Sequence, residues 1–346
     1  MYTSEQVKAY LTHKDDIVSN GAIQYFAESF NYTEGIMERV LDKLSGSLTP
    51  DRIYLHLVSS FPQSAETVSR MAKLLSKSSL KGNSRLHIQQ TLLSSPPSLL
   101  EQVLAELQPL QDETSVKAEE HIRIGQMEPE QLRETLQQMI EASRGLEYDD
   151  LEYDYLDYLV NVAISKQALT PEYVISKLEQ ADPEDTANYE SVYYTQAAGK
   201  MKLASAVPLL IDYLASTNDL LAEQACDALV RIGSEDVVSR LAERYAKEQD
   251  DYFKLYAADC LGRISDPAAE PAVLSLLQKE RNLTHATKLA ASLCFMGSKQ
   301  SIPVITKLIE SGYDDDYLDL REPLYLNCVM NEVELPQLLE WRKTFL

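Results

Sequence analysis

Three kinds of side chain in this sequence could do chemistry: thiols, imidazoles and clustered carboxylates. The thiols are regularly spaced, with a step of 34 residues between successive cysteines, and none forms the C-x-x-C pair that binds zinc or exchanges disulfides. The helical units described below repeat every 31 to 33 residues, so these cysteines drift around their helices and cannot form one column. We therefore predict four reduced thiols, buried in the core as small apolar residues. They are Cys226, Cys260, Cys294 and Cys328.

The imidazoles are scattered, and no two of them have the spacing of metal ligands. Each is interpreted as a surface or partly buried side chain. The chain also lacks a Gly-rich phosphate loop, an H-E-x-x-H motif and a G-x-S-x-G motif. The sequence therefore predicts no catalytic residue, no metal site and no cofactor, and hence a protein that is not an enzyme. The five histidines are His13, His56, His87, His121 and His285.

The carboxylates are most concentrated between residues 147 and 158, where six acidic residues occur without a basic one. Asp150, Asp154 and Asp157 fall at helical spacings on one face, opposite an apolar stripe. Carboxylates along one straight helix point roughly in parallel and cannot wrap a calcium ion with the roughly six to eight oxygens that it prefers. The pattern fits both a solvated acidic face and a site for a cationic partner.

Acidic residues and tyrosines also cluster where helical units join. An Asp just before a helix caps free N–H groups, which explains part of this pattern. It does not explain runs of three Asp, nor 20 Tyr against 6 Phe. Tyr suits recognition surfaces as well as half-buried helix faces. The candidate partner-binding residues are Asp150, Asp154, Asp157, Asp250, Asp251, Tyr252, Asp314, Asp315, Asp316 and Tyr317.

The overall charge limits the class of partner. The 346 residues include 32 Lys and Arg against 54 Asp and Glu, a formal charge of −22, of which residues 146–346 carry −17. Nucleic acid and anionic membranes are bound by electropositive surfaces, so we expect neither as a partner and expect a protein with basic segments instead. No apolar run approaches the roughly 18 residues of a membrane helix, and the N-terminus does not resemble a signal peptide. These features predict a soluble, cytoplasmic protein.

The elements that carry these residues are predicted to be helices arranged in repeats. Only 11 Gly occur, and apolar residues recur at steps of three and four almost throughout. Met201, Ile232, Ile264 and Met296 occupy equivalent places at steps of 31, 32 and 32 residues. Each unit reads as an Ala-rich helix, a short break and a second helix, and the whole chain holds about ten such pairs.

We therefore predict an all-α fold, a right-handed α-α superhelix (α-solenoid) of about ten helix pairs. Residues 1–145 are expected to form degenerate repeats and residues 146–346 acidic repeats, continuous as one solenoid. Stacked pairs bury a common core, and Ala-rich first helices permit close approach. We expect an elongated, curved rod whose concave surface is lined by one helix of each pair.

Three strings carry a resemblance to a known family: Ala-Gly-Lys-Met at 198–201, Ala-Leu-Val-Arg-Ile-Gly at 228–233 and Cys-Leu-Gly-Arg-Ile-Ser at 260–265. They resemble HEAT repeats of the short bacterial type, the PBS-lyase HEAT-like repeats, most closely between residues 190 and 310. The resemblance implies the solenoid fold and not an activity, because these residues make core and turns.

Enzymatic HEAT-like families can be compared residue by residue. The deoxyhypusine hydroxylase type uses His-Glu dipeptides to bind iron, and this chain has none. The alkylpurine DNA glycosylase type uses a basic groove, which a charge of −22 opposes. The bilin lyase type is not excluded by charge. The leading hypothesis is thus a non-catalytic protein-interaction scaffold or adaptor. The alternatives are an enzyme or small-molecule carrier of the bilin-lyase or glycosylase kind, and an immunity-type antidote to a basic toxin.

Overall fold

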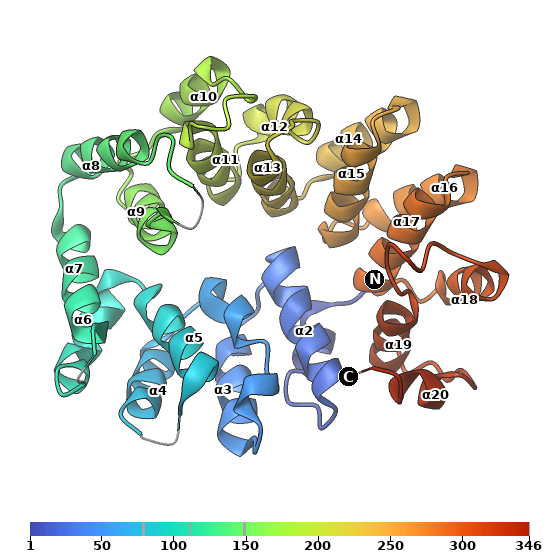
Figure 1. The fold of residues 1–346 in the computed structure, drawn as a ribbon, viewed down its shortest axis with the longest axis horizontal. Helices are drawn as coiled ribbons and strands as arrows, with labels where there is room; N and C mark the ends of the chain where they lie inside the picture. Colours follow the sequence, from blue (N-terminus) through green and yellow to red (C-terminus); the bar gives the residue numbers. More distant parts are fainter. Residues whose placement is uncertain (78–79, 111, 148–149, 346) are drawn as a thin grey trace.

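The computed structural model describes residues 1–77, 80–110, 112–147 and 150–345, and the regular structure in these ranges is helical throughout (Figure 1). The helices follow one another as ten pairs, which confirms the predicted all-α solenoid of about ten units. In the second pair a 3-10 helix takes the place of the first α-helix. No helix within the described ranges is both long and apolar enough to cross a membrane.

The first members of the pairs are α2 (Asp16–Ser29), η2 (Leu55–Ser60), α5 (Gly82–Leu93), α7 (Thr114–Gln126), α9 (Tyr153–Ser165), α11 (Glu190–Lys200), α13 (Asp219–Ile232), α15 (Asp251–Arg263), α17 (Leu283–Phe295) and α19 (Arg321–Met330). The second members are α3 (Ile36–Gly46), α4 (Ala65–Leu75), α6 (Pro97–Leu107), α8 (Pro129–Ala142), α10 (Pro171–Gln180), α12 (Val207–Tyr213), α14 (Glu235–Lys247), α16 (Ala269–Lys279), α18 (Ile302–Ser311) and α20 (Leu338–Arg342). Within the described ranges, three short helices lie outside the pairs: α1 (Ser4–Lys8), η1 (Pro50–Arg52) and η4 (Ala204–Ala206).

Local sequence signals fix where these helices begin and end. Pro271 and Pro303 lie in the first turns of α16 and α18, where a missing N–H costs no intrahelical hydrogen bond. The side chain of Ser234 accepts a hydrogen bond from the N–H of Val237 and caps α14. Gly233 ends α13 with φ of +50°, a left-handed conformation that favours glycine.

Small residues let the first helices of neighbouring pairs pack closely. A Cβ atom built on Gly199 of α11 would lie 2.5 Å from the Cα atom of Ala228 on α13, and one built on Gly262 would lie 2.6 Å from the Cβ atom of Ser292. The close approach expected from Ala-rich first helices is therefore present. All four cysteines are free and buried, as predicted.

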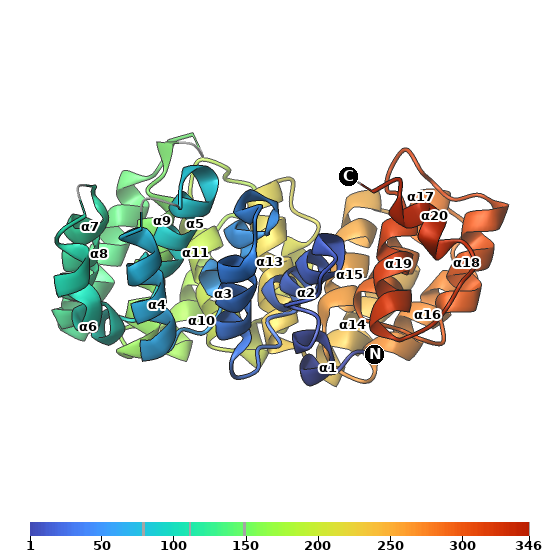
Figure 2. The same cartoon turned by 90° about the horizontal axis from the view of Figure 1, so that it is seen from below.

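The array is not the open rod that we expected, because its two ends meet (Figures 1 and 2). The backbone N–H of Tyr2 donates to the carbonyl oxygen of Met296 at 2.9 Å. Asp15, at the start of α2, accepts hydrogen bonds from the hydroxyl of Tyr325 at 3.0 Å and from the guanidinium of Arg342 at 2.6 Å. α2 also packs against α13, α15 and α19.

The physical reason for closure is that a solenoid leaves an apolar face uncovered at each end. Here the ends cover one another. Tyr325 and Met330 belong to the same buried apolar cluster as the N-terminal repeats, and Gly21 of α2 lies directly against the side chain of Leu326. The helices from α2 to α15 therefore surround a central space instead of flanking an open groove (Figure 1).

Candidate functional site

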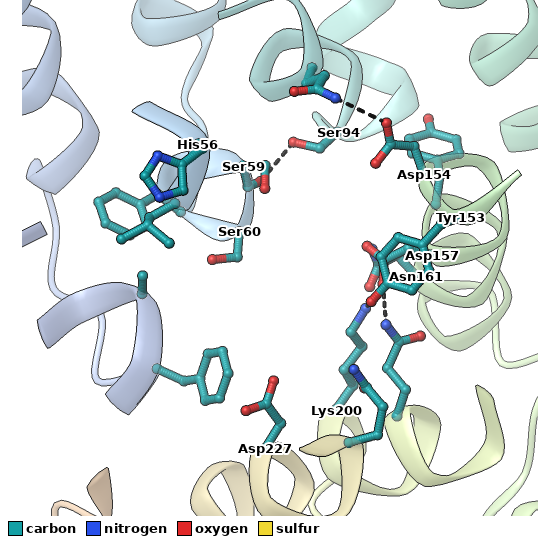
Figure 3. Close-up of a pocket in the computed structure, with 18 of the residues that line it drawn as sticks. His56, Ser59, Ser60, Ser94, Tyr153, Asp154, Asp157, Asn161, Lys200 and Asp227 are labelled. Atoms are coloured by element: carbon teal, nitrogen blue, oxygen red, sulfur yellow. Dashed lines mark hydrogen bonds and ion pairs between the residues drawn. The ribbon is translucent and has the colours of Figure 1, made fainter. Parts of the chain in front are cut away.

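The ring of helices encloses a cavity of about 1890 Å³. It is lined by α2, η2, α5, α7, α9, α11, α13, α15 and α17, which are first members of their pairs. Nine of the ten pairs in the described ranges thus have one helix facing the concave side, as expected, and the pair of α19 and α20 does not contribute. In Figure 3, His56, Ser59 and Ser60 lie across the cavity from Tyr153, Asp154 and Asp157. The two walls differ in chemistry.

The wall made by α13, α15 and α17 carries a ladder of paired charges. Asp227 and Asp259 are equivalent residues of successive repeats, and Arg231 and Arg263 follow each of them by four residues. The guanidinium of Arg263 lies 2.5 Å from a carboxylate oxygen of Asp227 and 3.1 Å from one of Asp259. The ammonium of Lys288 lies 2.5 Å from Asp259. Arg263 thus lies between the acid of its own helix and that of the preceding helix, and Lys288 reaches the acid of the helix before its own.

The ladder continues onto α9 and α11. The ammonium of Lys200 lies 2.8 Å from a carboxylate oxygen of Asp157, and the side-chain amide of Gln196 donates to the same oxygen (Figure 3). Burial opposes ionisation of Asp157, but Lys200, Gln196 and the nearby Arg231 outweigh it and lower the pKa of this carboxyl. Asp157 is therefore a structural anion held in the wall.

The opposite wall carries a column of histidines. His56, His87 and His121 come from η2, α5 and α7, and the rings of His56 and His87 are 5.8 Å apart between centroids. His121 stacks on the ring of Tyr158 at 3.8 Å, and its Nδ1 lies 2.8 Å from the carbonyl oxygen of Leu93. Burial and the neighbouring His87 lower the pKa of His56, and burial lowers that of His121. These histidines are therefore not scattered, as the sequence had suggested, because they lie on the first members of three successive pairs.

Acidic residues outnumber basic ones around the cavity, and several of them lack a basic partner. Asp150, Glu152, Asp154 and Glu223 form no ion pair with any described residue. Burial and neighbouring carboxylates, chiefly that of Asp227, raise the pKa of Glu223. The negative charge of these four carboxylates is not compensated by an ion pair among the described residues.

Comparison with known proteins supports the fold. The sequence profile described as HEAT repeats matches residues 175–255, the segment that runs from α10 into α15 and contains part of the ladder. Residues 175–255 therefore match HEAT repeats. A solved structure described as an engineered protein aligns over 99% of this chain and 100% of its own, with 15% identity and a TM-score of 0.34, too weak a superposition to carry an argument. No curated protein matches the chain.

The ten candidate residues of this HEAT-like array divide into two groups. Those that line the cavity are Asp150, Asp154, Asp157, Tyr252 and Tyr317, and those that do not are Asp250, Asp251, Asp314, Asp315 and Asp316. The residues outside the cavity have local roles or are exposed. Asp250 caps α15 by accepting from the N–H of Phe253 at 2.7 Å, and Asp314 accepts from the N–H of Tyr317 at 3.2 Å. Among the described residues, no three His, Cys, Asp or Glu side chains gather as a metal site would require.

The charge ladder should make the HEAT-like array sensitive to acid. Burial opposes ionisation of Asp259, but Lys288 and Arg263 outweigh it and lower its pKa from 3.8 to about 2. Because the folded-state pKa is depressed, this carboxylate stabilises the fold above about pH 4, and the contribution is lost as the pH falls toward 2. We expect a loss of about 2 kcal/mol across this window. Urea unfolding of the natural protein and of Asp259→Asn between pH 5 and 2 measures this loss. The variant should have a lower free energy of unfolding at pH 5, and that free energy should fall less on acidification.

Proposed function

We propose that this protein is a non-catalytic binding module that holds a positively charged segment of a partner protein in its central cavity. HEAT repeats commonly serve as protein-interaction scaffolds, and the concave side of such an array is its natural binding surface. The observation that supports the proposal most directly is the set of unpaired carboxylates on the cavity wall.

Tyrosines accompany these carboxylates. Tyr155, Tyr252, Tyr256 and Tyr317 line the same cavity, and the Tyr252 side chain is 71% exposed. An aromatic face attracts Lys and Arg side chains, and a carboxylate beside it adds a charged hydrogen-bond acceptor. An excess of negative charge also steers a cationic segment toward the cavity and speeds its association. A wall of this composition suits Lys and Arg side chains.

The size of the cavity favours a polypeptide segment over a small molecule. Small-molecule sites commonly have volumes of roughly 300–1,000 Å³ and are mostly apolar. A space of about 1890 Å³ with charged walls is larger and more polar than that. This argues against the alternative of an enzyme or small-molecule carrier. A basic toxin held by an acidic antidote remains one specific form of the proposed interaction.

Two double variants with the same charge change test the proposal. Asp154→Asn with Glu223→Gln removes two carboxylates from the cavity, and neither residue forms an ion pair within the described chain. Asp315→Asn with Asp316→Asn removes two exposed carboxylates outside it. We expect the first pair to weaken binding of a fluorescent oligo-arginine peptide about tenfold, or ~1.4 kcal/mol, and the second to change it much less.

Fluorescence anisotropy at several salt concentrations provides the measurement. Affinity should fall as salt rises, because the attraction is between charges. An oligo-glutamate peptide serves as the negative control. Equal losses in the two double variants would assign the effect to net charge alone, and the absence of binding at low salt would contradict the proposal.

A further inference from the structure

Beside the acidic cavity lies a small pocket of the opposite charge. It has a volume of about 350 Å³ and lies where the end of α2 meets the turns that follow α11 and α13. Lys200, Lys202 and Arg231 contribute to its lining, and no acidic residue does among those described. In a chain with a net charge of −22, a pocket without any acid is unusual. Phe30, Lys200 and Arg231 line both spaces, so the pocket adjoins the cavity directly.

Arg231 belongs to the charge ladder, but it forms no ion pair with a carboxylate of the described chain. Arg263 reaches Asp227 on the preceding helix, and the equivalent residue on the helix before Arg231 is Gln196. The Gln196 amide already donates to Asp157, and its buried Oε1 has no hydrogen-bond partner among the described residues. Gln196 therefore offers Arg231 no negative charge.

The guanidinium of Arg231 is held in place without an acid. It lies over the ring of Phe30, 3.5 Å from the centroid, and forms no hydrogen bond or ion pair with any described residue. Phe30 ends α2 with φ of +51°, a conformation that is uncommon for a bulky side chain and that sets its ring against Arg231. Lys202, also at a positive φ, is exposed and without an ion pair in the described chain. Two cations thus face the pocket with free donors.

We infer that this pocket is a carboxylate subsite, and that the basic segment held in the cavity is a free C-terminal end of the partner chain. The inference rests on the function proposed above. A guanidinium presents paired N–H donors that match a carboxylate. The carboxylates of Asp157 and Asp227 on the adjoining wall repel a doubly charged phosphate about twice as strongly as a singly charged carboxylate. The pocket is also too small for more than the end of a chain.

A carboxylate subsite would reverse the order of peptide affinities that is expected from net charge alone. An amidated oligo-arginine peptide carries one more positive charge than its free acid, so an acidic cavity alone would bind the amide more tightly. With a carboxylate subsite, we expect the free acid to bind about five- to tenfold more tightly than the amide. Fluorescence anisotropy with both peptides at one salt concentration decides between these outcomes.

Variants connect the preference to the pocket. Arg231→Gln should abolish the preference for the free acid, and Lys202→Gln, at an exposed position, should reduce it without affecting folding. Arg240→Gln, which removes an exposed arginine paired only with Asp236, is the control and should leave it unchanged.

The possible outcomes distinguish failure of the carboxylate subsite from failure of the proposed function. Equal or tighter binding of the amide would overturn the carboxylate subsite while leaving the proposed function in place. No binding of either peptide would overturn both. An amidated peptide that ends in phosphoserine and binds more tightly than the free acid would assign the pocket to a dianion and so contradict the inference.

Discussion

Replacing Arg263 with glutamine should lower the free energy of unfolding by about 4 kcal/mol. Its guanidinium pairs with Asp227 and Asp259, and its Nε donates to the carbonyl oxygen of Glu28 at 2.9 Å. Only 11% of the Arg263 side chain is exposed, so water replaces these interactions poorly. Loss of one partner from a buried charge pair commonly costs roughly 3–5 kcal/mol, because the remaining charge is left uncompensated.

The same substitution should loosen the ring, because Glu28 belongs to α2 and Arg263 to α15. We expect lower stability in urea, and a larger radius of gyration in small-angle scattering at moderate urea concentration. Arg240→Gln is the matched control: its side chain is 52% exposed, and an exposed ion pair contributes less than about 1 kcal/mol. A loss for Arg263→Gln no larger than that of the control would show that the ladder does not stabilise the closed ring.

The parts of the fold that repeat could be predicted from the sequence. Steps of 31 and 32 residues mark equivalent positions, and they give the helix pairs and the helices that line the concave side. Closure could not be predicted in this way. It depends on single contacts between residues more than 290 positions apart, such as Tyr2 with Met296 and Asp15 with Arg342. Such contacts occur once and leave no periodic signal.

The site was predictable only in part, for a related reason. Helical spacing placed Asp154 and Asp157 on one polar face, and both line the cavity. It could not show that Lys200 neutralises Asp157 while Asp154 has no basic partner, because that depends on which helices become neighbours. Acidic runs between helical units are expected both on recognition surfaces and at helix N-caps. The sequence alone could not tell these roles apart, and Asp250 is an N-cap.

Gly199→Ala should destabilise the protein by about 2 kcal/mol, whereas Gly46→Ala should leave its stability unchanged or slightly higher. Alanine is the better helix former, by roughly 1 kcal/mol in a helix interior. At Gly46, the exposed last residue of α3, a Cβ atom meets nothing within 4 Å, so this preference decides the outcome. At Gly199 the new Cβ atom would lie 2.5 Å from the Cα of Ala228 and 2.7 Å from its Cβ.

The Gly199 contact cannot be relieved by a side-chain rotation, because one of the two atoms belongs to the backbone of α13. α11 and α13 must therefore separate, and overpacking of this kind costs up to about 3 kcal/mol, which outweighs the gain of roughly 1 kcal/mol in helix preference. Urea unfolding of both variants and of the natural protein measures the two changes in stability: a loss for Gly199→Ala, and none or a slight gain for Gly46→Ala. Separation of these helices also moves Lys200 away from Arg231, so Gly199→Ala should weaken peptide binding while Gly46→Ala leaves it intact. Equal stabilities for the two variants would contradict the close packing on which the cavity wall depends.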